Sequence, residues 1–375
     1  MVHAYYIVSK NLACILLTSH YIWEDLGDIL KVPLSALELP VDLLVAGPPC
    51  PPWAGQGNHQ AMNDPRAKVF VQVILWIIHL AYCGGLLCFI VENVPGVLNS
   101  HHGLETTMDK FVRILRVAIP FFVVKVDMLR LVDYRSPQTR VRVFLRGIRT
   151  CVVAEVPPCL SPWGASRLQD FLGNFPHTHR ESFSQQQQDN IRAYEIKIRQ
   201  LVQQGRLSPH DIVAIHPDRQ DGLTYPQHMT VNKYPTMTTQ NGDTMLLSVD
   251  DVVAATPDSQ RRVFRVLQAT ERLTIAGFPA KLVEHLGVKL TMKATGNAYP
   301  PALIIATLAP LLRALSTMDL TQWPPADLPT NVPGGLLDRA KRLLKARGRI
   351  VDKAKYERWK KASQKKRKRS SSSSD

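Results

Sequence analysis

Cysteine is scarce in this chain of 375 residues, which contains only six. None of them forms a CxxC pair or a zinc-finger spacing, so neither a zinc site nor a disulfide framework is expected. Cys14, Cys83 and Cys88 fit core positions instead, and unpaired cysteines favour a reducing intracellular compartment. His177 and His179 lack partners at ligand spacing and fit a surface loop better. We therefore predict a protein without a bound metal.

Long apolar runs are missing as well. The most apolar stretch, residues 69–91, is interrupted by Gln72 and His79 and broken by Gly84 and Gly85. A membrane-spanning helix needs about 20 consecutive apolar residues, so this stretch is interpreted as a buried helix, a turn and a strand. The first residues also lack the pattern of a signal peptide. No membrane partner is therefore expected.

Acidic residues are rare near the C-terminal end. Residues 335–375 contain 16 Lys and Arg against 4 Asp and Glu, a net charge of +12 out of +15 for the whole chain. The run KKRKR at 365–369, followed by serines, is typical of a nuclear-import signal or a phosphate-binding arm, and a solvated tail without a partner is the alternative. Residues 336–361 have a helix-forming composition with only a partial apolar face, made by Leu343, Leu344 and Ile350.

The most informative stretch, residues 43–57, reads LLVAGPPCPPWAGQG. Its apolar start is typical of a buried strand of a parallel sheet. Prolines on both sides of Cys50 end that strand and restrict the backbone around it. In open α/β sheets, chemistry takes place just beyond the carboxyl ends of strands. The stretch therefore presents a thiol on a stiff turn at such an edge, and a buried structural cysteine is the alternative.

Strand and helix patterns alternate through the first 149 residues. A strand and the start of a helix are expected within residues 4–17, and a short strand region within 26–32. The later elements are strand 41–46, helix 67–82, strand 86–91, helix 105–117, strand 121–131 and strand 140–146. This alternation predicts a doubly wound, mixed α/β sheet whose last strands are antiparallel.

The pattern changes after Gly147. Residues 151–230 are rich in Pro, His, Gln and Arg and show little strand periodicity. One amphipathic helix is expected at 187–204, with its QQQQ run on a polar surface and an apolar face formed by Ile191, Tyr194, Ile198 and Leu201. Periodicity returns after residue 262, and two more helices are expected, at 268–275 and 300–315.

Four short motifs follow one another in a characteristic order. They are PC at Cys50, ENV at Glu92, QxRxR at residues 138–142 and GNxxP at residues 296–300. Through these motifs, and through ERLTIAGFP at 271–279, the chain resembles the C5-cytosine methyltransferase family over roughly residues 4–315. Any single tripeptide would be a weak signal, but four in order are a strong one.

The resemblance implies a covalent mechanism on cytosine. Cytosine C5 is a poor nucleophile, and addition of a cysteine thiolate to C6 enables C5 to attack a methyl donor. The motifs assign that thiolate to Cys50 and the acid beside N3 to Glu92, for which a salt-bridged or helix-capping residue is the alternative. Asn93 would bind substrate or orient the turn. A duplex hides the base, so the base must be flipped out, and loop 51–68 is the expected clamp.

The QxRxR motif supplies two further catalytic residues by resemblance. Because Arg140 and Arg142 are two positions apart, we expect them to project on the same side of a strand. A guanidinium can hold O2 of the base or a phosphate, or lock a carboxylate. The resemblance assigns Arg142 to the base and Arg140 to support of the site, and a surface charge ladder is the alternative. Gln138 is implied to bind substrate.

S-adenosylmethionine is the methyl donor that the resemblance implies. The family's first motif, an F-x-G-x-G turn, should precede the first strand and is not found. The acidic residue expected on the ribose hydroxyls falls near Val8 or Ser9, which cannot make that contact. We therefore expect an N-terminally incomplete chain that binds the donor weakly. Four residues match the family's donor-binding positions: Asp28, Pro49, Asn297 and Ala298.

These patterns together predict a DNA (cytosine-5)-methyltransferase of the nucleus. We expect a catalytic α/β domain at 1–149, a target-recognition region at 150–240, a return to the catalytic domain at 241–317, and a linker with a disordered basic tail at 318–375. The predicted partner is DNA, and RNA is less favoured. Two alternatives stay open, namely a catalytically impaired nucleic-acid-binding relative and an RNA cytosine-5 methyltransferase.

Overall fold

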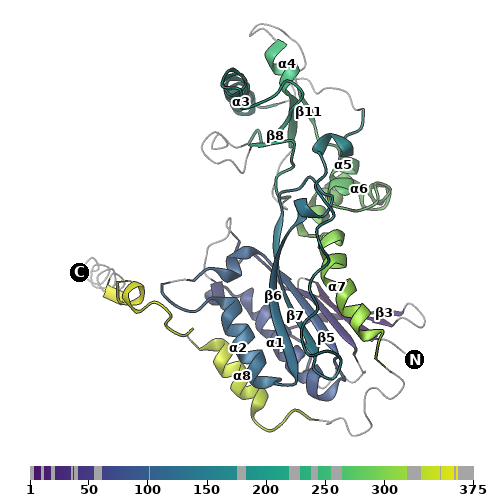
Figure 1. The fold of residues 1–375 in the computed structure, drawn as a ribbon, viewed down its shortest axis with the longest axis vertical. Helices are drawn as coiled ribbons and strands as arrows, with labels where there is room; N and C mark the ends of the chain where they lie inside the picture. Colours follow the sequence, from purple (N-terminus) through teal and green to yellow (C-terminus); the bar gives the residue numbers. More distant parts are fainter. Residues whose placement is uncertain are drawn as a thin grey trace. The chain divides into compact units, whose positions relative to one another are not determined.

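The computed structural model describes residues 4–9, 12–17, 22–34, 37, 41–54, 61–100, 102–174, 183–218, 229–237, 244–254, 264–318, 331–346, 348–358 and 360–361. The chain forms two compact units (Figure 1). The first contains residues 1–128, 142–160 and 307–375, and the second contains residues 129–141 and 161–306. The domain boundaries expected from the sequence concern catalytic and recognition regions, and they stay predictions.

A seven-stranded mixed sheet forms the first unit, in the order β3-β2-β1-β4-β5-β7-β6. β1, β4 and β5 are mutually parallel, whereas β2 pairs antiparallel with β1 and with β3, and β7 pairs antiparallel with β5. The mixed α/β class is therefore confirmed. The strands are β1 Ala4–Ser9, β2 Leu12–Leu17, β3 Ile22–Asp28, β4 Leu43–Gly47, β5 Cys88–Asn93, β6 Phe122–Arg130 and β7 Val141–Arg149.

The N-terminal part of the sheet corrects one expectation. A helix was predicted to begin within residues 4–17, but that stretch forms the two antiparallel strands β1 and β2. Only two residues separate Ser9 from Leu12, which suits an antiparallel pair, since a parallel crossover needs about a dozen residues. The short strand expected at 26–32 lies earlier, in β3, and ends at Asp28.

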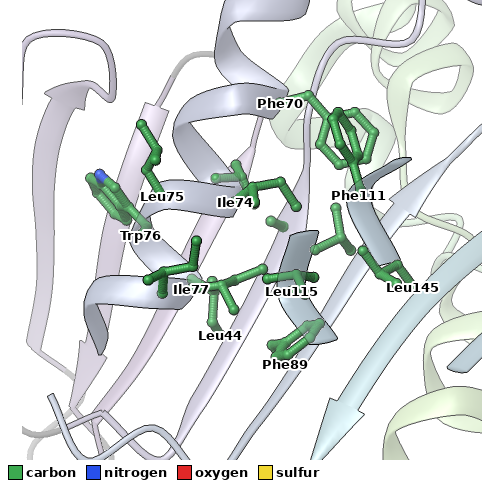
Figure 2. Packing of buried hydrophobic residues seen from close by; sticks show 14 of the residues in the cluster. Leu44, Phe70, Ile74, Leu75, Trp76, Ile77, Phe89, Phe111, Leu115 and Leu145 are labelled. Carbon is green, nitrogen blue, oxygen red and sulfur yellow. The ribbon is translucent and has the colours of Figure 1, made fainter. Parts of the chain in front are cut away.

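Helices α1 (Ala67–Cys83) and α2 (Thr107–Ala118) cover one face of this sheet, as the apolar spacing predicted. Figure 2 shows Phe70 of α1 beside Phe111 of α2, and Ile77 of α1, Leu115 of α2 and the sheet residues Leu44 and Phe89 belong to the same cluster. These side chains are almost fully buried. Each such burial contributes roughly 1.5–3 kcal/mol, so this layer fixes the strands whose ends carry Cys50 and Glu92.

Helix α7 (Pro301–Leu315), also predicted, reaches the opposite face of the sheet. Within β7, Val143 and Leu145 belong to the core against α1 and α2. Arg146 points the other way, because side chains alternate along a strand. Its fully buried guanidinium donates to the carbonyl of Thr307 in α7 at 3.3 Å and to Asp127 at 2.8 Å. The first unit thus has helices on both faces of the sheet.

The basic C-terminal segment corrects a second expectation. Residues 336–345 form helix α8, which agrees with the helix-forming composition of 336–361 and not with the disordered tail expected at 318–375, and α8 packs beside α1 and α2 (Figure 1). Ala340 and Leu344 are buried in the core of the first unit. The buried ammonium of Lys110 donates to the carbonyl of Leu344 at 2.6 Å, and so satisfies a C-terminal carbonyl of α8. Burial lowers the pKa of Lys110, and the negative charge of Glu105 acts in the opposite direction. The run KKRKR lies outside the described residues.

Helices and a small antiparallel sheet form the second unit, in the strand order β11-β10-β8-β9. Helix α3 matches the amphipathic helix predicted at 187–204, with its four expected apolar residues buried and its glutamines on the surface. Helix α5 matches the prediction at 268–275. The elements are α3 Gln185–Gln203, β8 Ile212–Ile215, β9 Met229–Val231, β10 Met245–Ser248, α4 Val249–Ala254, β11 Phe264–Val266, α5 Ala269–Ile275 and α6 Leu282–Asn297.

No single helix among the described residues is long and apolar enough to cross a membrane. In the described part of the chain, α6 and α7 reach that length and composition when taken together, as a pair bent by 46°. The stretch 69–91, which the sequence assigned to a helix and a strand, forms α1 and β5 with a turn at Gly84 and Gly85.

Candidate active site

Cys50 lies three residues beyond the end of β4, at the first residue of a tight turn. Its carbonyl accepts hydrogen bonds from the backbone N–H of Trp53 at 2.9 Å and of Ala54 at 3.0 Å. The thiol-bearing residue is half-buried. By contrast, Cys88 is completely buried in β5, where burial raises the pKa of its thiol. The structure therefore places Cys88 in the core, as predicted, and Cys50 at a strand end.

Asn93 ties the end of β5 to the turn that carries Cys50. Its amide Nδ2 donates to the carbonyl of Pro48 at 3.3 Å, and its Oδ1 accepts from the N–H of Val94 at 2.9 Å. The side chain is fully buried, so these bonds replace those that water would make. Asn93 thus bonds the backbone of both strand ends, and its contact with substrate stays a prediction.

Glu92 and Arg142 form an ion pair beside this turn. Arg142 Nε lies 2.6 Å from Glu92 Oε1, and both side chains are largely buried, with 9% and 13% of their surface exposed. In the β5–β7 ladder Glu92 pairs with Phe144, so Arg142 is its diagonal neighbour two residues away. The arginine therefore locks the carboxylate, which is one of the three roles the sequence left open for it.

Trp53 fixes the start of the loop that follows Cys50. Its indole Nε1 donates to Thr107 Oγ1 at 3.1 Å, and its ring packs edge-on against Phe70 at 5.5 Å. The backbone of Gly96 touches it so closely that a Cβ there would lie 1.9 Å from the Trp53 carbonyl oxygen. Residues 51–54 of the predicted clamp are thus anchored, and residues 55–60 lie outside the described part of the chain.

Replacing Gly96→Ala should displace Trp53 and the turn that carries Cys50. Because the clash is with backbone, we expect a loss of about 1–3 kcal/mol in the free energy of unfolding, as in other overpacked cores. Gly334→Ala is the matched control, since nothing lies within 4 Å of a Cβ at that position. Thermal unfolding of both variants is the measurement. Equal melting temperatures for the two variants would contradict the close approach at Gly96.

Arg66 is a cation near Cys50 that the sequence gave no reason to select. Its Nη2 lies 2.6 Å from Asp64 Oδ2. The hydrogen bond from Arg66 lowers the pKa of Asp64. The same bond raises the pKa of Arg66, and the charge of the Cys50 thiolate adds to that rise. A single arginine in a loop has no periodicity and belongs to no motif, so only the fold brings it near the thiol.

Arg140 departs from its expected position. It was predicted to share a strand face with Arg142, but β7 begins at Val141 and Arg140 precedes it. Within the second unit, its Nη2 donates to the carbonyl of Ala298 at 2.8 Å, and its Nη1 lies 3.4 Å from the carbonyl of Gly296. These carbonyls end α6 and would otherwise lack partners. Arg140 therefore supports the GNxxP segment, and its part in catalysis stays a prediction.

Gln138, at the start of the same motif, is buried in the second unit. Its N–H donates to Ser136 Oγ at 3.2 Å, and residues on either side of it bond the backbone of Tyr234. Among the described residues, its side-chain Nε2 has no hydrogen-bond partner. A buried amide donor without a partner is uncommon, and the predicted contact of Gln138 with substrate would supply one.

The four candidate donor-binding residues are divided between the units. In the first unit, Pro49 precedes Cys50, and Asp28 ends β3 on the same sheet edge, because β3 runs parallel to β1 and β4. Asp28 Oδ1 accepts from the N–H of Leu30 at 3.0 Å. In the second unit, Asn297 ends α6 with an exposed side chain whose Nδ2 donates to a backbone carbonyl, and Ala298 follows it.

Comparison with known proteins gives a family match over most of the chain. The family model described as C-5 cytosine-specific DNA methylase matches residues 10–312. The type II methyltransferase M.HgiCII of Herpetosiphon aurantiacus is 34% identical over 129 residues, which cover 34% of this chain and 26% of that protein. M.AquIA of Picosynechococcus sp. is 31% identical over 140 residues, 36% of this chain and 55% of that protein. The chain thus spans between about a quarter and about half of the length of these relatives.

Solved structures give a more distant likeness. That of the Entamoeba histolytica methyltransferase EhMeth aligns with 78% of this chain and 83% of its own, at 16% identity and a TM-score of 0.47. The family match includes every residue of the four motifs, from Cys50 to Pro300. The chain therefore belongs to the C-5 cytosine-specific DNA methylase family.

Proposed function

We propose that this chain transfers a methyl group from S-adenosylmethionine to C5 of cytosine in DNA, with Cys50 as the nucleophile. The observation that carries the proposal is the meeting of a thiol and an anchored carboxylate at one sheet edge. β4 and β5 are adjacent and parallel, so their carboxyl ends lie side by side. Cys50 follows the first, Glu92 is the penultimate residue of the second, and Asn93, which ends the second, bonds the two together.

Each residue has a defined chemical task in this proposal. The Cys50 thiolate forms a bond to C6, and the ring's electron pair becomes available at C5 while charge develops toward N3. Glu92, as the acid, shares its proton with N3, and Arg142 holds that side chain in place. C5 then bonds a methyl group, which S-adenosylmethionine supplies when bound. Solvent takes up the C5 proton, and the electron pair of the broken C–H bond restores the C5–C6 double bond as the S–C6 bond breaks. Cys50 leaves as the thiolate, and N3 returns its proton to Glu92.

In the first unit, Asp28 and Pro49 are the residues that would hold the donor, and the carboxylate of Asp28 suits the amino group at the adenine end of S-adenosylmethionine. Within the described part of the chain, Asp28 Oδ2 accepts no hydrogen bond, since the Leu30 N–H bonds the other oxygen. Taken by itself, the second unit carries the other two candidates, Asn297 and Ala298. The exposed Asn297 amide donates one N–H to the Lys293 carbonyl and has a second N–H for the methionine carboxylate, the group that its family position implies.

A covalent trap tests the nucleophile. Duplex DNA that contains 5-fluorocytosine should form an adduct that resists denaturation when S-adenosylmethionine is present, because fluorine cannot leave C5 as the proton does. Cys50→Ala should abolish the adduct and leave DNA binding intact. The matched control is Cys151→Ala, which removes an exposed thiol elsewhere in the first unit and should keep the adduct. Denaturing gel electrophoresis with labelled DNA is the measurement.

The outcomes separate this proposal from its rivals. An adduct that persists in Cys50→Ala would exclude Cys50 as the nucleophile. No adduct in the unsubstituted chain, with DNA binding retained, would favour the non-catalytic nucleic-acid-binding relative. An adduct with transfer RNA and none with duplex DNA would change the substrate to RNA and leave the chemistry in place.

A further inference from the structure

A strongly basic surface lies on the first unit, and the proposed reaction does not use it. We call it the basic ledge and define it as residues 336–346, 348–358 and 360–361, which are α8 and the described part of the segment that follows. It contains 10 Lys and Arg against 3 Asp and Glu, a net charge of +7. The remaining basic run, KKRKR at 365–369, lies beyond it and outside the described residues. A charge of this density on a folded surface attracts polyanions.

The ledge is fixed to the core of the first unit. The inner face of α8 packs on α1 and α2 through Ala340 and Leu344. Beyond the helix, the N–H of Val351 donates to the carbonyl of Gly103 at 2.8 Å, and the N–H of Arg349 donates to Glu105 Oε1 at 2.8 Å. Its cations are therefore carried on an ordered backbone, which reduces the entropy that a flexible basic tail would lose on binding.

One stripe of the ledge points outward. Asp338, Lys341, Arg342 and Lys345 follow helical spacing, are exposed and line a shallow hollow with Gly335. Within the described residues, no carboxylate lies within 4.0 Å of the charged groups of Lys341, Arg342 and Lys345. A helix rises 1.5 Å per residue, so Lys341 and Lys345 stand about 6 Å apart along the axis. One strand of DNA carries a charge every ~3.4 Å, which places the two cations about two phosphates apart.

We propose that the basic ledge binds the phosphate backbone of duplex DNA without reading its sequence. The proposal rests on the proposed function only for the choice of DNA as the polyanion. An anionic membrane is the other surface that a basic helix can bind, but a membrane-binding helix inserts its apolar face. The apolar face of α8 is already used against α1 and α2, so only its charged face is available.

The test measures DNA affinity of the full chain as salt is raised. The variant combines Lys341→Gln, Arg342→Gln and Lys345→Gln, and the probe is a duplex made only of A·T pairs, so no cytosine can engage Cys50. Each phosphate contact contributes about 0.9 to the slope of log affinity against log salt. The slope of the triple variant should therefore be shallower by about 2 to 3. Thermal unfolding should be unchanged, because the three side chains are exposed.

A matched control removes the same charge elsewhere. Arg116→Gln, Lys125→Gln and Arg313→Gln alter three exposed cations elsewhere in the first unit, and should change the slope by less than 1. Equal changes in both variants, or no change in the ledge variant, would overturn the proposal. The proposal would also be overturned if the ledge variant lost its binding to phosphatidylserine vesicles but kept its binding to DNA. Because the duplex lacks cytosine, failure of the covalent trap would leave this result standing, and the reverse also holds.

Discussion

Deleting residues 336–375 should unfold the first unit, whereas deleting residues 362–375 should leave its melting temperature unchanged. The longer deletion uncovers the faces of α1 and α2 that α8 buries and removes the carbonyl that Lys110 bonds. Water would then reach the Lys110 ammonium, so the destabilisation comes mainly from the uncovered apolar surface. The combined loss should exceed about 5 kcal/mol, which is comparable with the whole stability of a typical domain. Circular dichroism during heating is the measurement.

A pair of point variants makes the same test without shortening the chain. Leu344 is fully buried and Lys345 beside it is exposed. Leu344→Ala should cost about 2–5 kcal/mol, as for other core leucines, and Lys345→Ala should stay within about 0.5 kcal/mol of the parent. If both deletions and both point variants melted alike, α8 would not be part of the core.

Glu92→Gln should reduce methyl transfer by about two to four orders of magnitude, the usual contribution of a general acid. The amide keeps the size of the side chain and can still bond Arg142, but it cannot deliver a proton to N3. Arg142→Gln should also reduce transfer, because it releases the carboxylate that the guanidinium holds at 2.6 Å. Single-turnover rates with duplex DNA and added S-adenosylmethionine are the measurement.

The double variant Glu92→Gln, Arg142→Gln shows whether Arg142 only holds Glu92 in place or also contacts the base. If Arg142 acts only through Glu92, then Arg142→Gln should have little further effect once Glu92→Gln is present, because effects within one unit of side chains are not additive. Independent, multiplying losses would show that Arg142 also touches the base. Arg130→Gln is a matched control, since Arg130 pairs with Asp133 at 2.9 Å in an exposed position. Activity that survives in Glu92→Gln would remove Glu92 from the mechanism.

The part of the site in the first unit could be predicted from local sequence. β4 and β5 are short apolar runs whose side chains are buried on both faces, and α1 separates them with an unmistakable apolar pattern. Parallel strands joined by a helix bring their carboxyl ends to one edge. The sequence therefore predicted Cys50 and Glu92 at one edge of the sheet, and the pairing of β4 with β5 makes them neighbours there.

Arg140 could not be placed in the same way. Spacing of two residues predicts a shared face only inside a strand, and the start of β7 is a matter of long-range pairing. The N–H of Thr139 donates to the carbonyl of Tyr234 at 2.8 Å. The residue just before Arg140 therefore bonds another part of the second unit and not a strand of the seven-stranded sheet. That contact spans almost a hundred residues, so no local pattern could reveal it.

The elements that the sequence did not predict lie mostly in the second unit, and their burial explains why. In β8, Val213 and Ile215 face one apolar cluster while Ala214 faces another, so the alternation that marks a strand is lost. In α6 polar residues are buried and apolar residues are exposed. Thr291 and Thr295 are buried, whereas Val288 and Leu290 are at least half exposed. Prediction from hydrophobic periodicity assumes that apolar residues face the core and polar residues face solvent. Neither β8 nor α6 shows that pattern.

The position of α8 has a consequence for synthesis on the ribosome. α1 and α2 are complete by residue 118, but the helix that closes their core begins at residue 336. At roughly 5–20 residues per second, about 10 to 40 s pass between these two events. During that interval the nascent first unit exposes an apolar surface, while the second unit, encoded in between, has already emerged. The order of emergence therefore exposes this chain to chaperones for longer than its size alone requires.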